Sequence, residues 1–355
     1  MTHEQPRTDE PRLPGMSKTA IWVAAARAVG AREPDPLVRN PDHIAEKLLG
    51  DTAGLVLDHP IVDALSLTYE EAMQDIEVAD TVRAMIERTR FIDEALERAI
   101  AGGVTQVLIP GAGLDSHAYR YRDLLAGASV FEVDRPATLE FKQRRVDEAL
   151  GGPPENLSYV PIDFQSEEIG DVLLQNGYDL SRLTFVIMEG LTMYLPEDAV
   201  RAAFRFVASH APGSSVVFDY ASSAMAASMQ NIDLSKVPPA AVPSIKRFID
   251  LFKNEPWLFG FPIGGENAFL KPLGLELGEL LTLGSEESVG RYLTRADGTT
   301  VGAEAHAKAQ ALRTAAQAYA AAKMRAEEKQ AHQERMREQQ TQMAYRIAEA
   351  FVRPV

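Results

Sequence analysis

The chain has 355 residues, carries 36 Lys and Arg against 51 Asp and Glu, and contains no cysteine. The formal charge of −15 disfavours nonspecific binding to nucleic acid or anionic lipid, because such binding needs basic side chains that displace counterions. The lack of cysteine excludes disulfides, thiolate zinc sites and cysteine nucleophiles and fits a reducing cytoplasm, and no apolar run approaches the roughly 20 residues of a membrane span.

The first 102 residues divide into a polar leader and a helical region. Residues 1–15 contain three prolines and five charged side chains without an apolar stretch, so we expect a disordered leader rather than a signal peptide. Residues 16–102 are expected to form the helical N-terminal part of the domain. Its first helix begins at Ser17, and its last, over 80–101, is strongly periodic and ends at two glycines.

Residues 103–300 alternate between strands and helices, which predicts an α/β fold. The expected strands are 104–109, 129–133, 157–162, 183–188 and 214–220, and the expected helices are 136–150 and 196–210. This order describes a parallel sheet with helices on both faces and a ligand at the carboxyl ends of the strands.

Residues 221–274 break the alternation and are expected to be a lid inserted over the sheet. Its large apolar side chains either line an acceptor pocket or only bury the lid on the sheet: Met225, Met229, Trp257, Phe259 and Phe261. A sixth strand at 275–283 and a short helix at 286–293 are expected to follow.

The C-terminal segment has a different composition. Residues 301–342 are rich in Ala, Gln and charged residues and lack Pro and Gly after Gly302, so they are expected to form a long helix. Residues 301–355 carry nine basic and six acidic side chains, which leaves the acidity in the rest of the chain. The helix is expected to protrude or to pair with a second copy, and 344–352 fits either more helix or a returning strand.

Glycines and carboxylates follow the predicted strands. Gly111 and Gly113 come directly after the first, and Asp134 follows the second about 20 residues later, where a carboxylate can accept hydrogen bonds from a ribose diol. Asp163 with Phe164 follows the third strand, and Glu189 follows the fourth. These ends meet at one edge of a parallel sheet and predict a ligand site there.

Two other kinds of site are disfavoured by the same residues. Ser116 stands where a dinucleotide-binding fingerprint requires a third glycine, so NAD is not supported. The seven histidines show no metal-ligand spacing, and we expect no metal.

Four segments resemble the class I S-adenosylmethionine-dependent methyltransferases, and specifically the leucine carboxyl methyltransferase-like family of bacterial O-methyltransferases. They are PGAGLDSHAYR (110–120), FEVDRPATLEFK (131–142), PIDF (161–164) and EGLTMYLP (189–196), and the segment 17–42 is similar to the N-terminal signature of that family. The resemblance implies a Rossmann-like, seven-stranded and mostly parallel sheet with a returning antiparallel strand, for which 344–352 is the candidate. The terminal strand then lies within 343–355.

The resemblance also implies roles for single residues in binding S-adenosyl-L-methionine. Asp134 would hold the ribose hydroxyls, Asp163 and Phe164 would lie at the adenine, and Gly111 and Gly113 would line the methionine part. Lys18 and Arg88 match basic positions that neutralise the cofactor carboxylate, and Glu189 matches a carboxylate near its amine. Two positions depart from the general methyltransferase pattern: Ile109 replaces an acidic residue, and Asp115 replaces a third glycine.

The implied activity is methyl transfer to an oxygen of a small-molecule acceptor. A carboxylate acceptor is already ionised and needs no base, whereas a phenolic or alcohol hydroxyl needs a base, for which His117, Tyr194 and Tyr220 are the candidates near strand ends. A third alternative is a cofactor-binding module without turnover that assembles through its C-terminal helix. The sequence leaves these alternatives open.

Overall fold

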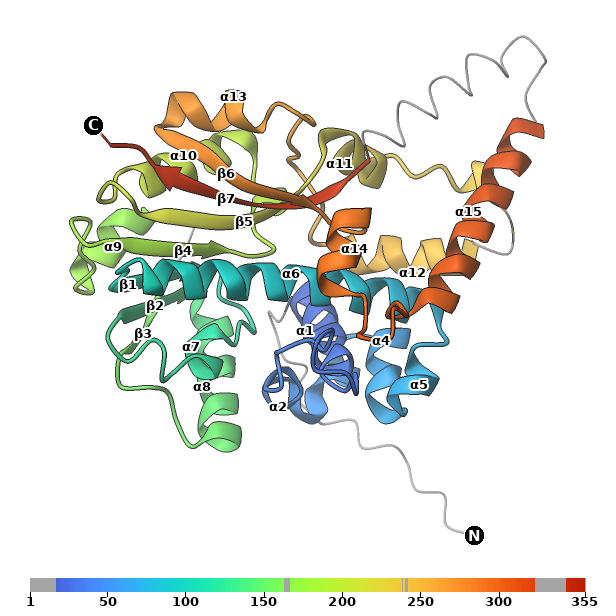
Figure 1. Cartoon of the computed structure of the whole chain (residues 1–355), viewed down its shortest axis with the longest axis horizontal. Helices are drawn as coiled ribbons and strands as arrows, with labels where there is room; N and C mark the ends of the chain where they lie inside the picture. Colours follow the sequence, from blue (N-terminus) through green and yellow to red (C-terminus); the bar gives the residue numbers. More distant parts are fainter. Residues whose placement is uncertain (1–16, 163–166, 238, 240–241, 323–342, 355) are drawn as a thin grey trace.

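The computed structural model describes residues 17–162, 167–237, 239, 242–322 and 343–354 (Figure 1). Its centre is a seven-stranded sheet in the order β3-β2-β1-β4-β5-β7-β6. The strands are β1 (Gln106–Pro110), β2 (Ser129–Asp134), β3 (Leu157–Pro161), β4 (Thr184–Met188), β5 (Ser215–Ala221), β6 (Leu275–Thr282) and β7 (Tyr345–Val352). Neighbouring strands from β3 to β5 pair in parallel, and β7 pairs antiparallel with both β5 and β6. The predicted mostly parallel α/β sheet is confirmed, and 344–352 is the returning strand rather than more helix.

Helices cover both faces of this sheet (Figure 1). They are α1 (Lys18–Gly30), α2 (Ala45–Leu49), α3 (Ala53–Val56), α4 (Pro60–Asp63), α5 (Tyr69–Ala72), α6 (Ile76–Ala101), α7 (His117–Arg120), α8 (Pro136–Leu150), α9 (Ile169–Gln175), α10 (Glu197–Ala208), α11 (Ser223–Gln230), α12 (Val242–Phe252), α13 (Glu266–Leu270), α14 (Glu286–Tyr292) and α15 (Ala303–Ala322). No described helix is both long enough and apolar enough to cross a membrane.

The alternation of side chains along the strands divides the interior into two cores. On β1, Val107 and Ile109 point to a first core that also contains α1, α6 and α8, whereas Leu108 points to a second core with α10 and α13. Because both faces are apolar, the strands are almost continuously hydrophobic, as parallel strands covered on both sides are.

The inserted segment 221–274 contributes to both cores. Phe259 and Phe261 pack against Phe204 and Phe269 in the second core, with ring centroids 4.8–6.2 Å apart. Trp257 belongs to the first core, where its ring lies 6.0 Å from that of Tyr345. The phenylalanines therefore bury the insertion on the sheet, while Trp257 lies on the side of α1 and α12.

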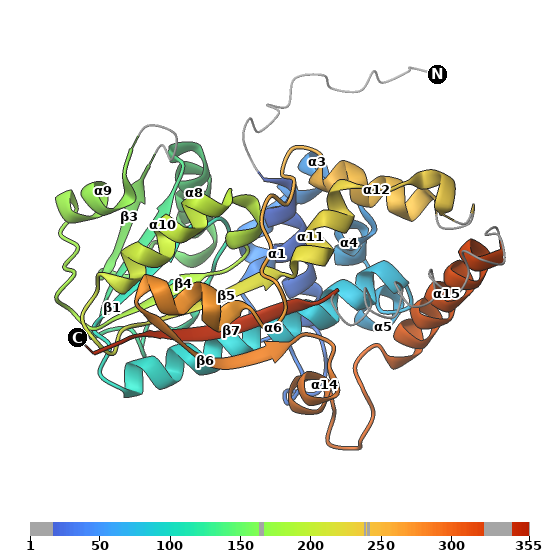
Figure 2. The same ribbon diagram turned by 90° about the horizontal axis from the view of Figure 1, so that it is seen from above.

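Helix α15 begins against α6 and then leads away from the sheet (Figures 1 and 2). Its buried side chains Ala305 and Ala309 lie in its first half, and Leu312, which is 58% exposed, lies beyond them. Residues 323–342 of the predicted helix lie outside the described residues. Pairing of this helix with a second copy stays a prediction.

Candidate active site at the carboxyl ends of the strands

The glycine turn after β1 is anchored to the end of β2. Gly111 and Gly113 have φ values of 69° and 44°, which strain any residue with a Cβ. The amides of Gly111 and Ala112 donate to the carbonyl of Val133, and the amide of Gly113 donates to Oδ2 of Asp134 at 2.7 Å. The predicted glycines and the predicted ribose carboxylate are thus brought together at the adjacent carboxyl ends of β1 and β2.

Asp134 is 8% exposed and retains acceptor capacity in this position. Its second oxygen, Oδ1, accepts from the amide of Arg135 at 2.7 Å. A carboxylate offers about four lone-pair directions. Two remain for the hydroxyls of a ribose diol.

Glu189, at the end of β4, belongs to a buried group of charges. Nη2 of Arg88 lies 2.6 Å from Oε1 of Glu189, and its Nη1 donates to Oδ2 of Asp219 at 2.8 Å. The same Asp219 oxygen accepts from the hydroxyl of Tyr345 at 2.5 Å, and Oδ1 accepts from the amide of Gly190 at 2.6 Å. Burial alone would lower the pKa of Arg88, but Glu189 and Asp219 outweigh it and raise that pKa. Two of the predicted residues, Arg88 and Glu189, are therefore in direct contact.

A second arginine connects Glu189 to helix α1. Nη1 of Arg27 lies 3.6 Å from Glu189, and its Nε lies 3.3 Å from Oδ2 of Asp42. Arg27 also donates to the carbonyl of Leu114 at 2.8 Å, in the loop that continues the glycine turn. Arg27 is buried, so its charge is stabilised by these partners rather than by water.

His117, a candidate base, is fully buried between two carboxylates. Its Nδ1 lies 2.7 Å from Asp115, and its Nε2 lies 3.1 Å from Asp93, which Arg120 also binds through both of its Nη atoms. Burial opposes the charge of the ring, but Asp115 and Asp93 outweigh it and raise the pKa of His117 to about 9. The imidazolium then has no lone pair with which to accept a proton at neutral pH.

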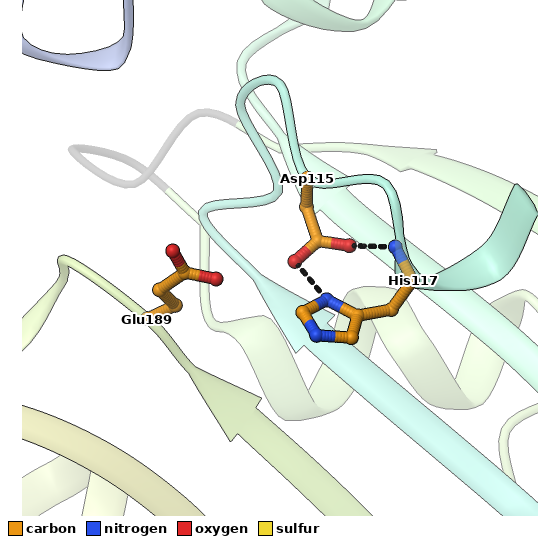
Figure 3. A group of neighbouring side chains, drawn as sticks. All are labelled: Asp115, His117 and Glu189. Atoms are coloured by element: carbon orange, nitrogen blue, oxygen red, sulfur yellow. Dashed lines mark hydrogen bonds and ion pairs between the residues drawn. The ribbon is translucent and has the colours of Figure 1, made fainter. Parts of the chain in front are cut away.

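Figure 3 shows Asp115 in the loop after β1, His117 at the start of α7, and Glu189 opposite them, directly after the end of β4. One ligand atom from each of the three lies within 4.8 Å of the others. A metal ion at this position would have to displace the proton of His117 and compete with Arg27 and Arg88 for Glu189.

The pKa of His117 makes stability depend on pH. Its value of about 9 in the folded protein exceeds the ordinary value of 6.5, so the stabilisation is complete below pH 6.5 and disappears as the pH rises through 9. We expect urea denaturation to show that the excess stability of the wild type over His117→Asn shrinks by about 3 kcal/mol between pH 6 and pH 10. A constant difference across this range would show that His117 is not held as an imidazolium.

The remaining predicted residues lie elsewhere. Lys18 starts α1, and its Nζ pairs with Asp250 of α12 at 3.0 Å rather than with the charges around Glu189. Tyr194 is half-buried in the turn after β4, and burial raises the pKa of its hydroxyl. Tyr220 lies in the second core and donates to Glu266 at 2.9 Å. Asp163 and Phe164 lie outside the described residues.

Sequence reasoning missed six members of the site: Arg27, Asp42, Asp93, Arg120, Asp219 and Tyr345. Two of them had a usable signal. Arg27 is the one charged residue between Lys18 and Gly30 in an otherwise apolar helix, and Asp219 interrupts the apolar strand 215–221. A charge in such a segment must be paired when the segment is buried.

Comparisons with known proteins agree with the geometry. A family model described as leucine carboxyl methyltransferase matches residues 20–208. A provisionally named S-adenosyl-L-methionine-dependent methyltransferase of Mycolicibacterium vanbaalenii is 37% identical over 217 residues, which are 57% of this chain and 66% of that protein. One of Mycolicibacterium smegmatis is 35% identical over 58% of this chain and 67% of its own length.

Among solved structures, a magnesium protoporphyrin IX methyltransferase of Synechocystis PCC 6803 with bound SAH is 13% identical to this chain. The match covers 77% of this chain and 87% of that chain, with a TM-score of 0.40.

Proposed function

The chain belongs to the leucine carboxyl methyltransferase family, and we propose that it transfers the methyl group of S-adenosyl-L-methionine to a carboxylate of a small-molecule acceptor. The observation that supports this most directly is the buried site at the strand ends. It combines a glycine turn, a carboxylate that can accept hydrogen bonds from a ribose diol, and charges of both signs. A zwitterionic amino-acid end needs both signs of charge around it. The residues present therefore fit this cofactor.

We assign the cofactor contacts residue by residue. Asp134 would accept from the ribose hydroxyls, Glu189 would accept from the amine, and Arg88 would face the carboxylate. Gly111 and Gly113 would let the methionine part approach the backbone. Lys18 would join Arg88 only after leaving Asp250, and the proposed adenine contacts Asp163 and Phe164 lie outside the described residues.

The protonation states of the candidate bases favour a carboxylate acceptor over a hydroxyl acceptor. His117 carries its proton between two carboxylates, and burial keeps the hydroxyl of Tyr194 protonated. A carboxylate is ionised at neutral pH and attacks without losing a proton. The cofactor, when bound, supplies the methyl group as a sulfonium with a good leaving group. The protein then contributes binding, alignment and exclusion of water.

The test is turnover with a panel of carboxylic acids and a panel of phenols and alcohols. We expect acceptor-dependent formation of S-adenosylhomocysteine with one or more carboxylates, at a kcat that changes less than about twofold between pH 6.5 and pH 8.5. A hydroxyl acceptor that needs a base would instead give a rate that rises about tenfold per pH unit below the relevant pKa. Turnover confined to phenols would contradict carboxyl methylation, and calorimetry without any binding of S-adenosylmethionine would contradict the whole proposal.

A further inference from the structure

A surface pocket of about 460 Å³ lies where the inserted segment meets the N-terminal helices. Figure 2 shows α12 of the insertion beside α3, and both helices line the pocket. Lys18 at the start of α1 also lines it, and two residues later Ala20 packs on the glycine turn, where a Cβ on Gly113 would lie 3.9 Å from that of Ala20. Helix α1 therefore joins this pocket to the proposed cofactor site.

The two walls of the pocket differ in their chemistry. The wall formed by α3 and the residue after it is apolar and contains Leu55, Val56 and Leu57, of which Leu55 is 63% exposed. The wall formed by α12 is polar and contains Lys246 and Arg247. An amphiphilic anion fits this arrangement, because its apolar body would remove the leucines from water while its charge faces α12.

Cations outnumber carboxylates in this pocket, although the chain as a whole has a formal charge of −15. Burial lowers the pKa of His59, which also lines the pocket, from its ordinary value of 6.5, so its ring is neutral at pH 7. The charged side chains of the lining are then three cations and two carboxylates: Lys18, Lys246, Arg247, Asp58 and Asp250. The pocket is a positive region in an acidic protein and favours an anionic ligand.

Two of the three cations already have carboxylate partners. Nζ of Lys18 lies 3.0 Å from Asp250, and Nη2 of Arg247 lies 2.8 Å from Glu77 of α6. Among the residues that the structure describes, no carboxylate lies within ion-pair distance of Lys246. Lys246 is therefore the cation that a ligand can pair with without displacing another side chain.

Lys246 is suited to a part of the acceptor other than the carboxylate that is methylated. The reacting carboxylate must lie at the sulfonium of the cofactor, between the proposed contacts Asp134 and Glu189. Helix α12 reaches toward that region through Asp250, which contacts Lys18 of α1. Lys246 lies one turn earlier on α12, about 5.4 Å along its axis. A group bound there belongs to the far end of the acceptor.

We propose that this pocket binds the methyl acceptor and that Lys246 selects dicarboxylic acids with an apolar body. This inference rests on the proposed function and makes Lys246 a specificity-determining residue. One carboxylate oxygen of the acceptor forms the bond to the methyl carbon as the S–CH3 bond breaks, and the electron pair of that bond passes to sulfur. The monoester and S-adenosylhomocysteine form without loss of a proton, while the second carboxylate stays ionised at Lys246.

The test compares acceptors that differ only in the second carboxyl group. NMR titration of the S-adenosylhomocysteine complex measures the Kd of a medium-chain dicarboxylic acid and of the monocarboxylic acid of the same length. We expect the wild type to bind the diacid about five- to tenfold more tightly, Lys246→Arg to keep this ratio, and Lys246→Glu to reduce it to about one or below. The ratio of kcat/KM values with S-adenosylmethionine should change in parallel, whereas the Kd of S-adenosylhomocysteine should stay within about twofold.

Lys253→Glu is the matched control, because Lys253 is exposed just after α12 and lies outside the pocket lining. It makes the same change in net charge and should keep the wild-type ratio. Equal Kd values of the two acids in the wild type, binding of neither acid, a ratio retained in Lys246→Glu or a ratio lost in Lys253→Glu would overturn the inference. If Lys246→Glu does not fold, Lys246→Met removes the charge without adding a repulsive one and decides in its place. A wild type that does not bind S-adenosylhomocysteine contradicts the proposed function, whereas equal binding of both acids to the complex contradicts only this inference.

Discussion

Replacing Arg88 with Met is expected to lower the free energy of unfolding by about 3–5 kcal/mol. Its guanidinium is 3% exposed and lies between two carboxylates, Glu189 at 2.6 Å and Asp219 at 2.8 Å. Removing the cation leaves Asp219, which is fully buried, with the neutral hydrogen-bond donors Tyr345 and Gly190 as its partners among the described residues. An unpaired buried charge costs far more than the pair contributes, because no water replaces the lost partner.

Chemical denaturation of three variants separates this explanation from a loss of packing. Arg88→Met combined with Asp219→Asn should recover part of the lost stability, since the second change removes one of the unpaired charges. Lys308→Met is the control: Lys308 pairs with Glu304 at 2.8 Å on the surface of α15, where both side chains are exposed. We expect less than about 1 kcal/mol there. If Arg88→Met also lowered the free energy of unfolding by less than about 1 kcal/mol, Arg88 would not be buried between charges.

The part of the site that could be predicted lies at the ends of strands. Gly111, Asp134 and Glu189 each follow an apolar segment, and strands that alternate with helices place such ends along one edge. The sequence pattern therefore predicts that these residues lie at one edge of the sheet, although it does not predict their contacts. The confirmed sheet supports the same reasoning for β7, because the family resemblance required a returning strand there.

The ion pairs could not be predicted, because each joins elements that are distant along the chain. Asp93 lies on α6 and Arg120 on α7, and nothing in either segment indicates the other. Tyr345 reaches Asp219 because β7 inserts antiparallel beside β5, which depends on the whole sheet. Sequence periodicity indicates which side of a helix is buried, but it does not identify the partner of a buried charge.

His117 shows that the chemical role of a residue is also hard to predict when its contacts are unknown. A histidine near a strand end is a reasonable candidate base when its partners are unknown. Once Asp115 and Asp93 are seen on its two nitrogens, the same side chain is a buried cation that connects the glycine loop to α6. Residue type suggested a catalytic group, and the contacts indicate a structural one.

Replacing Asp134 with Ala is expected to weaken binding of S-adenosylmethionine by about 100-fold or more. The change removes the two acceptor oxygens proposed for the ribose diol. It also removes the acceptor for the amide of Gly113, so the glycine turn loses its anchor on β2. The two losses act on the same ligand, which makes this the largest effect on binding that we expect from a single residue. Isothermal calorimetry measures it directly.

Asp134→Asn distinguishes these two contributions. The amide retains one oxygen that can still accept from Gly113, but its nitrogen cannot accept from a hydroxyl, so we expect a smaller loss of about 10-fold. Asp147→Ala, an exposed carboxylate on α8, should leave the Kd unchanged and controls for the loss of one negative charge from an acidic protein. Binding of S-adenosylmethionine within twofold of the wild type in Asp134→Ala would mean that the ribose lies elsewhere. Asp134 would then serve only to anchor the glycine turn. In that case, urea denaturation would show Asp134→Ala to be less stable than the wild type by the same amount with and without S-adenosylmethionine.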